Sequence, residues 1–309
     1  MKIAYLFAGQ GSQYPGMGYS FYQNFPSSKA IYDDINLDFD VKQLCFYGEE
    51  EKLKDTEYAQ ACILATSLAI ASALDTSGIK PQYVAGLSLG EYSALAYAGS
   101  IDKDSALEIV RARGKIMAKA MPSGFGKMAA VLNTDQELIE NICKEVSNDI
   151  EVCEIANYNS PSQIVISGNT NAVDKAIKLL LDSGVRRVIP LNVSGAFHSS
   201  LLIEAANSFK GVLDKYNFNE CEIPVVYNFS GDETCKSIKD NLLSQLYSSV
   251  RFTQSIEYMI SKGVDTFVEI GPGNILSGFV RKISKDVRVY SIDSIESMEN
   301  FIKEVNDGK

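Results

Sequence analysis

Gly86, Ser88 and Gly90 form a Gly-x-Ser-x-Gly pattern, which can present a serine hydroxyl as a nucleophile. A short apolar run, 83–85, precedes the pattern and a helical segment of small residues follows it, which is the strand-turn-helix context that the pattern needs. The glycines suit a turn too crowded for side chains. Glu91 suits the dipole of the following helix, whose free N–H groups would face an oxyanion. We predict a nucleophile elbow; the alternative is a plain glycine-rich turn.

His198 is the only histidine in the chain. It follows a predicted strand, in the turn 195–200. A lone histidine can be purely structural, but a serine nucleophile needs a base and imidazole is the usual one. With Ser88 at an elbow, we expect His198 to be that base.

Arg113 lies in the middle of an apolar helical stripe. The inward members of that stripe are Ala106, Ile109, Val110, Ile116, Met117 and Ala120. We expect a solvated opposite face, made of Asp104, Glu108, Arg111, Lys115 and Lys119. An inward arginine requires an anion or several acceptors. Two interpretations are equal at this point: a buried salt bridge, or a bidentate clamp for a substrate carboxylate.

The glycine-rich turn 8–13 follows a predicted strand at 2–7. A dinucleotide fingerprint would need a glycine where Tyr14 stands, and no phosphate-binding lysine follows, so nucleotide binding is not indicated. The turn either presents a backbone N–H toward a neighbouring strand end or is a simple loop.

Composition narrows the class of protein. The 309 residues are 46% hydrophobic and 22% charged, which is typical of a globular protein, and the net charge of −10 argues against nucleic acid as the main partner. Six scattered cysteines, with no Cys-x-x-Cys pair and no histidine nearby, argue against a zinc site and fit free thiols in a reducing cytoplasm. We expect no signal peptide and no membrane span. The longest apolar stretch, near 61–74, lies within 56–76, which has apolar or small residues nearly all round and is predicted to be a buried helix.

The order of predicted elements indicates an α/β fold with an insertion. Between 126 and 195, strands at 127–132, 151–158, 163–167 and 186–193 alternate with helices at 135–146 and 171–181 in the order β-α-β-β-α-β, which is ferredoxin-like. The remainder alternates strands and helices, with strands at 223–227, 265–270 and 287–292. We therefore predict an α/β-hydrolase-like core with a parallel sheet at 1–125 and 196–309, and a ferredoxin-like small domain at 126–195.

With these residues in view, the chain resembles the malonyl-CoA:acyl-carrier-protein transacylases, the acyltransferases of type II fatty acid synthesis. The resemblance runs from end to end. It is carried by six ordered motifs, at 7–13, 86–95, 113–115, 157–161, 197–199 and 269–273.

The resemblance implies a role for each candidate residue. Ser88 would attack the malonyl thioester with His198 as general base and later as acid. The N–H groups of Leu89 and Gln10 would form the oxyanion hole, and Arg113 would bind the malonyl carboxylate.

Three further features follow from the resemblance. A main-chain carbonyl would orient the histidine; by position it would belong to Arg251, where relatives often carry glutamine. Leu87 stands where the family usually has histidine, which weakens any hydrogen-bonding role beside the nucleophile. Phe197, in Ala-Phe-His, would crowd an α-methyl group, so methylmalonyl is expected to be a poor substrate.

The partners implied are malonyl-CoA and acyl carrier protein, with no cofactor, no metal, no nucleic acid and no membrane. A cytoplasmic monomer is expected.

Because carrier proteins are acidic, docking would need local pairs of basic residues. The candidates are Arg186 with Arg187 and Arg281 with Lys282, unless these are scattered solvated charges. Three alternatives remain: a free-standing polyketide-synthase acyltransferase, a serine thioesterase, and a silent carrier-docking module.

Overall fold

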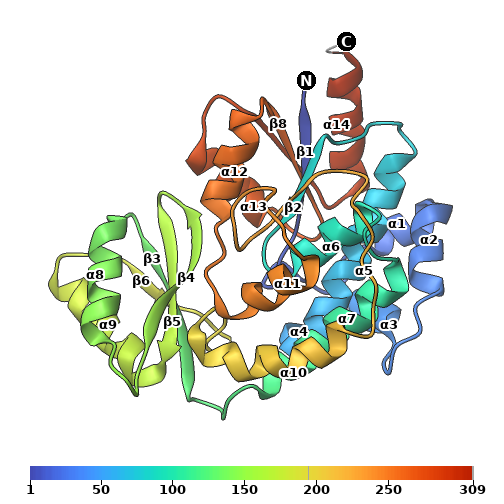
Figure 1. Cartoon of the computed structure of the whole chain (residues 1–309). Helices are drawn as coiled ribbons and strands as arrows, with labels where there is room; N and C mark the ends of the chain where they lie inside the picture. The colour runs from blue at the N-terminus through green and yellow to red at the C-terminus, as the bar shows by residue number, and fades with distance from the viewer. Residues whose placement is uncertain (194, 308–309) are drawn as a thin grey trace.

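The computed structural model describes residues 1–193 and 195–307, which form a larger and a smaller unit, each with its own sheet (Figure 1). The larger unit is built from both ends of the chain, and the smaller unit comes from one continuous stretch in the middle. The α/β class and the parallel sheet are therefore as predicted.

The sheet of the larger unit has, within the described residues, five parallel strands in the order β7-β2-β1-β8-β9. Tyr5 of β1 packs into one core and Leu6 into another, because alternate side chains of a strand point to opposite covered faces. Phe7 pairs with Gly86, so the turns that follow β1 and β2 start side by side. The strands are β1 (Ile3–Phe7), β2 (Tyr83–Gly86), β7 (Val225–Val226), β8 (Thr266–Ile270) and β9 (Arg288–Ile292).

Helices cover both faces of this sheet (Figure 1). They are α1 (Tyr19–Asn24), α2 (Pro26–Asp33), α3 (Val41–Tyr47), α4 (Glu50–Lys54), α5 (Thr56–Asp75), α6 (Gly90–Tyr97), α7 (Lys103–Lys119), α10 (Ile203–Leu213), α11 (Ile238–Tyr247), α12 (Phe252–Ser261), α13 (Ile275–Ile283) and α14 (Ile295–Asp307), with a 3-10 turn, η1 (Ser200–Leu202). By length and composition α5 could cross a membrane, but 83% of its apolar window is buried inside the protein. The predicted buried helix is therefore confirmed.

The smaller unit contains β3 (Gly126–Leu132), α8 (Gln136–Val146), β4 (Cys153–Ser160), β5 (Gln163–Asn169), α9 (Thr170–Asp182) and β6 (Val188–Pro190), in the predicted order. Its strands are antiparallel and lie in the order β4-β5-β3-β6. The last strand is shorter than the predicted 186–193. It ends at Pro190; the Leu191 N–H still donates to the Met128 carbonyl of β3, and the Val193 N–H then turns back to the Leu191 carbonyl.

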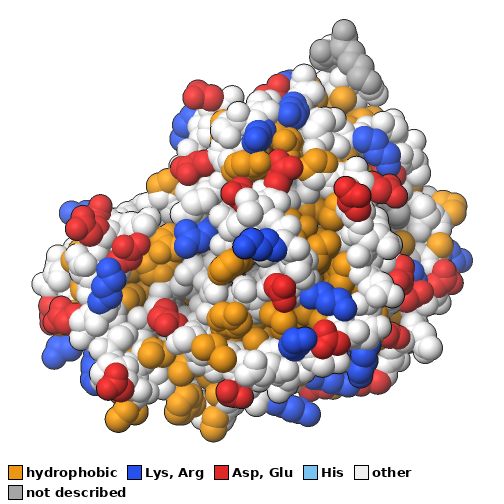
Figure 2. All heavy atoms as spheres, viewed as in Figure 1, with side chains coloured by type: hydrophobic (Ala, Val, Ile, Leu, Met, Phe, Trp, Pro, Cys, Tyr) orange, Lys and Arg blue, Asp and Glu red, His pale blue; other side chains and the backbone are white. Residues whose placement is uncertain are grey.

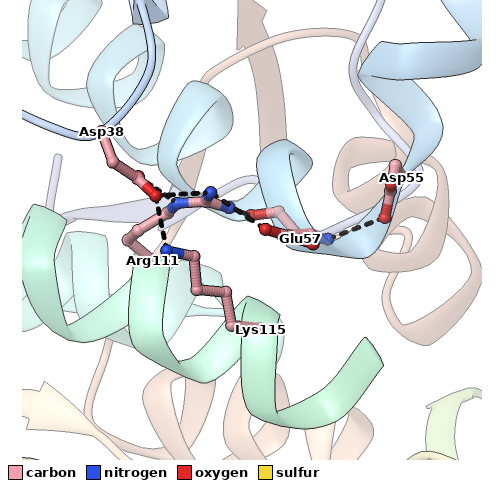
Figure 3. Close-up of polar contacts among 5 residues, drawn as sticks. All are labelled: Asp38, Asp55, Glu57, Arg111 and Lys115. Atoms are coloured by element: carbon pink, nitrogen blue, oxygen red, sulfur yellow. Dashed lines mark hydrogen bonds and ion pairs between the residues drawn. The ribbon is translucent and has the colours of Figure 1, made fainter. Parts of the chain in front are cut away.

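The prediction that Arg111 lies on a solvated face is wrong. Its side chain is buried, with ion pairs to Asp38 (2.7 Å) and Glu57 (3.0 Å), and the rings of Phe39 and Tyr58 lie 4.9 and 4.7 Å from the guanidinium carbon. Figure 3 shows Asp38 reaching over α7, where Lys115 also meets it, at 2.5 Å. The loop before α3 covers this face, which the periodicity of α7 alone does not reveal.

Candidate active site

The nucleophile elbow is present between β2 and α6. Ser88 has φ 52°, in the left-handed region that non-glycine residues rarely adopt. A Cβ on Gly86 would lie 2.0 Å from the Gly90 carbonyl carbon, and one on Gly90 would lie 2.1 Å from the Phe7 carbonyl oxygen. Both glycines are therefore required by close approach, as the sequence indicated.

His198 meets Ser88 across the sheet edge. Its Nε2 lies 2.8 Å from Ser88 Oγ, and its Nδ1 lies 2.8 Å from the main-chain carbonyl of Gln245 in α11. A carbonyl can only accept, so Nδ1 carries the proton and Nε2 is free to accept the serine proton. The geometry is that of a Ser-His pair whose base is oriented by a main-chain group.

The prediction that Arg251 supplies this carbonyl is wrong. Arg251 precedes α12, and its carbonyl accepts the N–H and the hydroxyl of Ser255, as expected at a helix start. The orienting residue is Gln245, at the end of α11, and the arginine at position 251 has no contact with His198 among the described hydrogen bonds. Position within the family resemblance was therefore the wrong guide to this carbonyl.

Burial gives His198 a neutral imidazole. Removal from water, together with the nearby Arg113 cation, lowers the pKa of His198 to about 4, and the Gln245 carbonyl opposes that shift. At neutral pH the ring is therefore uncharged and able to accept a proton.

Arg113 is fully buried on α7 and points at the nucleophile. Its Nη1 donates to Gln60 Oε1 (2.9 Å), while Nη2 donates to Gln245 Oε1 (3.0 Å) and to Ser88 Oγ (3.0 Å). The Tyr92 ring lies 5.3 Å from the guanidinium carbon. These partners are neutral, and among the described residues no carboxylate lies within 4 Å of the guanidinium nitrogens. Arg113 was expected either to form a buried salt bridge or to clamp a substrate carboxylate. The described residues contain no such salt bridge to Arg113.

Gln10, Leu87, Ser88, Phe197 and His198 line one cavity of about 510 Å³ between the two units. Further lining residues come from the motif at 157–161 and from α13: Asn157, Asn159, Ile275 and Phe279. In the part of the chain that the structure describes, neither the Gln10 N–H nor the Leu89 N–H donates to another protein group. Arg251 lies outside this cavity, in a separate cleft that His198 also borders.

Three contact residues were missed by the sequence argument: Gln60, Gln245 and Asn228. Gln60 and Gln245 hold the Arg113 guanidinium, and Asn228 contacts the backbone of Ser88. The one available signal was Gln60, the only glutamine in a predicted helix, 56–76, that consists mostly of apolar or small residues. The described residues include no group of three or more His, Cys, Asp or Glu side chains placed to hold a metal ion.

An elbow serine paired with a histidine on an α/β fold defines a class of proteins that form acyl-serine intermediates. The family model for the acyl transferase domain matches residues 4–307. The chain is 42% identical over 313 residues to the malonyl CoA-acyl carrier protein transacylase of Bacillus subtilis (strain 168), with 99% of each covered, and 41% identical over 304 residues to that of Staphylococcus aureus (strain MRSA252), with 97% of this chain and 98% of that one covered.

Solved structures agree. The malonyl CoA-acyl carrier protein transacylase from Clostridium perfringens ATCC 13124 superimposes with a TM-score of 0.96 at 41% identity, covering 99% of this chain and 98% of that one. A malonyl-transacylase solved in complex with its type II polyketide-synthase acyl-carrier protein has a TM-score of 0.94 at 35% identity, covering 98% and 100%. The chain belongs to the acyl transferase family and, within it, to the malonyl CoA-acyl carrier protein transacylases.

Proposed function

We propose that this chain transfers the malonyl group of malonyl-CoA to the phosphopantetheine thiol of an acyl carrier protein through a malonyl-Ser88 intermediate. One observation carries the proposal: a buried guanidinium, held by neutral amides, lies 3.0 Å from the candidate nucleophile. A buried cation that no described carboxylate contacts as an ion pair favours an anionic ligand. A malonyl group brings a carboxylate one methylene away from its reacting carbonyl.

In the first half-reaction Ser88 Oγ attacks the thioester carbonyl and its proton passes to His198 Nε2. The carbon–sulfur bond then breaks, and His198 returns that proton to the CoA thiolate. In the second half, the carrier thiol gives its proton to His198 and attacks the malonyl ester, and Ser88 recovers the proton as it leaves. The Gln245 carbonyl supports both steps by holding the ring and favouring the imidazolium.

The negative charge on the tetrahedral intermediate would be met by the N–H groups of Leu89 and Gln10. The positions of these two residues support this role. Leu89 precedes the first turn of α6, and Gln10 lines the cavity beside Ser88. Donors preorganised in a site shielded from water stabilise such a charge strongly. This would give the glycine-rich turn after β1 its function.

Phe197 is proposed to select malonyl over methylmalonyl. Its ring is 5% exposed and lines the cavity next to His198. A substituent on the malonyl α-carbon would have to displace this ring, which the packed core beneath it resists.

Docking of the carrier protein is proposed to use local basic pairs. Figure 2 shows acidic and basic side chains interspersed over this face of both units, without one large region of either sign. Arg281 and Lys282 are exposed on α13, the helix that supplies Ile275 and Phe279 to the cavity. Arg186 and Arg187 are exposed before β6. Charge reversal of either pair should raise the KM for carrier protein or CoA; an unchanged KM for both would exclude that pair.

We propose an acceptor in fatty acid elongation, as the resemblance to the acyltransferases of type II fatty acid synthesis implies. A polyketide-synthase carrier protein is the second candidate, because a 35% identical relative was solved with one. Kinetic comparison of the two classes of carrier protein distinguishes them.

The organisation is proposed as an α/β-hydrolase-like domain at 1–125 and 196–309 and a ferredoxin-like domain at 126–195. Two separate sheets and a separate core in the smaller unit support this division. A monomer in the cytoplasm is also proposed; the six cysteines, all free thiols in the structure, accord with a reducing compartment. Light scattering would test the monomer.

Intact-protein mass spectrometry after brief mixing with malonyl-CoA tests the function. We expect a malonyl adduct on the wild type that is absent in Ser88→Ala and that passes rapidly to added carrier protein. An adduct that water removes faster than the carrier thiol would indicate a thioesterase. Absence of any adduct would contradict the covalent mechanism and favour a silent docking module.

A further inference from the structure

Asn228, which no step of the proposed reaction uses, lies directly behind the nucleophile elbow, two residues after the end of β7. Its side chain is buried and makes two hydrogen bonds to the elbow. The Ser88 N–H donates to Oδ1 over 2.6 Å, and Nδ2 donates to the Gly86 carbonyl over 2.6 Å. One amide therefore joins both arms of the turn. Only a side chain that carries an acceptor and a donor can make both bonds.

Glu91 holds Asn228 from the other side. It stands in the first turn of α6, is fully buried, and its Oε2 accepts the main-chain N–H of Asn228 over 2.7 Å. Interaction with the helix dipole does not require burial, and a buried carboxylate is costly unless it is hydrogen-bonded. The contacts thus run from Ser88 to Asn228 and back to the helix that follows the serine.

Ser88 needs such support because its backbone is strained. A left-handed conformation at a non-glycine residue costs on the order of 1 kcal/mol or more and persists only where the surroundings impose it. Relaxation of φ from 52° would swing Oγ away from both His198 and Arg113.

We propose that Asn228 is a positioning residue for the nucleophile and that Glu91 acts through it, so that the Ser88 hydroxyl stays between His198 and Arg113. The Ser88 N–H is engaged by Asn228 and is unavailable to an oxyanion, which leaves that task to other donors. This inference rests on the proposed function only for Ser88 as nucleophile, and is independent of the acyl group transferred.

The test measures two quantities: the rate at which a fluorophosphonate labels Ser88, which needs an activated serine but no malonyl recognition, and kcat and KM for malonyl-CoA. Asn228→Ala and Asn228→Asp should lower the labelling rate and kcat by about 10²-fold, the cost of a nucleophile displaced by about 1 Å, while KM changes little. Glu91→Gln keeps an acceptor oxygen and should stay near wild type, whereas Glu91→Ala should lose about tenfold.

Asn169→Ala is the matched control. Asn169 is also a buried asparagine whose Oδ1 accepts a main-chain N–H, that of Val152 at 2.7 Å, but it lies in the smaller unit. Its variant should label at the wild-type rate. Equal losses in the control and the Asn228 variants, or folded Asn228 variants with wild-type rates, would overturn the proposal.

Two further outcomes are decisive. If neither Asn228 variant folds, Glu91→Ala and Glu91→Gln carry the test, and equal rates for the two would overturn the proposal. If wild-type Ser88 is labelled but accepts no malonyl group, only the proposed function fails; if it is not labelled, both fail.

Discussion

Arg113 Nη2 and Ser88 Oγ lie 3.0 Å apart, so the cation lies directly against the proposed nucleophile. The amides of Gln60 and Gln245 hold the guanidinium without neutralising it. A cation this close to the reacting atom suits an acid whose carboxylate is near its carbonyl. Burial, and next the same cation, lower the pKa of His198 and keep its ring neutral, so the proposed carboxylate clamp would also affect the strength of the base.

Arg113→Ala should lower kcat/KM for malonyl-CoA by about 10- to 100-fold, because a charge-assisted hydrogen bond is worth about 1.5–3 kcal/mol. The kcat/KM for acetyl-CoA, which has no carboxylate, should change by less than about threefold. Arg113→Lys retains the positive charge but not the bidentate geometry of the guanidinium. Its kcat/KM for malonyl-CoA should lie between those of the wild type and Arg113→Ala. Steady-state kinetics with both thioesters measures the ratio, and an equal loss for the two would contradict a carboxylate clamp.

The acid limb of kcat/KM should lie near pH 4. The neutral imidazole is the active form, and burial together with Arg113 lowers the pKa of His198 to about 4, so activity persists well below the usual histidine range and fails as pH falls through that value. Removing the cation in Arg113→Ala should move the limb toward pH 6.5. A wild-type limb at 6 to 7 would show that the imidazole is not shielded as the structure places it.

Stability should show the same shift. The folded pKa is below the unfolded value, so the unfolded chain binds the extra proton between about pH 6.5 and 4, and the free energy of unfolding decreases as pH falls through that window. His198 alone should contribute about 3 kcal/mol to this decrease. Urea unfolding of the wild type and of His198→Gln across this pH range measures the contribution. The free energy of unfolding should depend more steeply on pH in the wild type than in the variant.

The local patterns of the sequence carried much of the site. The elbow, the inward face of Arg113 and the single histidine each follow from spacing or residue type. Gln245 could not be found this way, because it acts through a main-chain carbonyl and through a side chain that meets Arg113 from another helix. The prediction that Arg111 is solvated was wrong for the same physical reason. The loop that covers its side chain lies 73 residues earlier in the chain, at Asp38.

The main chain and the side chain of Gln245 have different partners, so a substitution can remove the side-chain contacts and keep the main-chain one. Its carbonyl accepts from His198, while its amide accepts from Arg113 and donates to the Ser88 carbonyl over 2.9 Å. Gln245→Ala should leave the labelling of Ser88 by a fluorophosphonate nearly unchanged but reduce malonyl preference over acetyl by about tenfold, through a loosened guanidinium. Loss of labelling with preference intact would reverse these assignments.

The Arg111 cluster should matter for stability and not for chemistry. The guanidinium is buried between two rings and two carboxylates, so Arg111→Ala should lower the free energy of unfolding by about 2–4 kcal/mol, since removal of one partner leaves buried polar groups unpaired. Asp38→Asn should cost about 1 kcal/mol, because Asp38 is half-exposed and solvent screens the pair.

Lys115→Ala is the control for that pair of variants. Lys115 meets the same carboxylate but is partly exposed, so its removal should cost less than about 0.5 kcal/mol. Hydrogen bonding to Arg111, and next to Lys115, lowers the pKa of Asp38. The contribution of Asp38 to the free energy of unfolding is therefore complete at neutral pH. It is lost as the pH falls below the ordinary pKa of an aspartate and the carboxylate becomes protonated. Urea unfolding at pH 7 and pH 3 measures both effects, and a Lys115 loss as large as that of Arg111 would show that surface charge, and not the buried guanidinium, holds the loop.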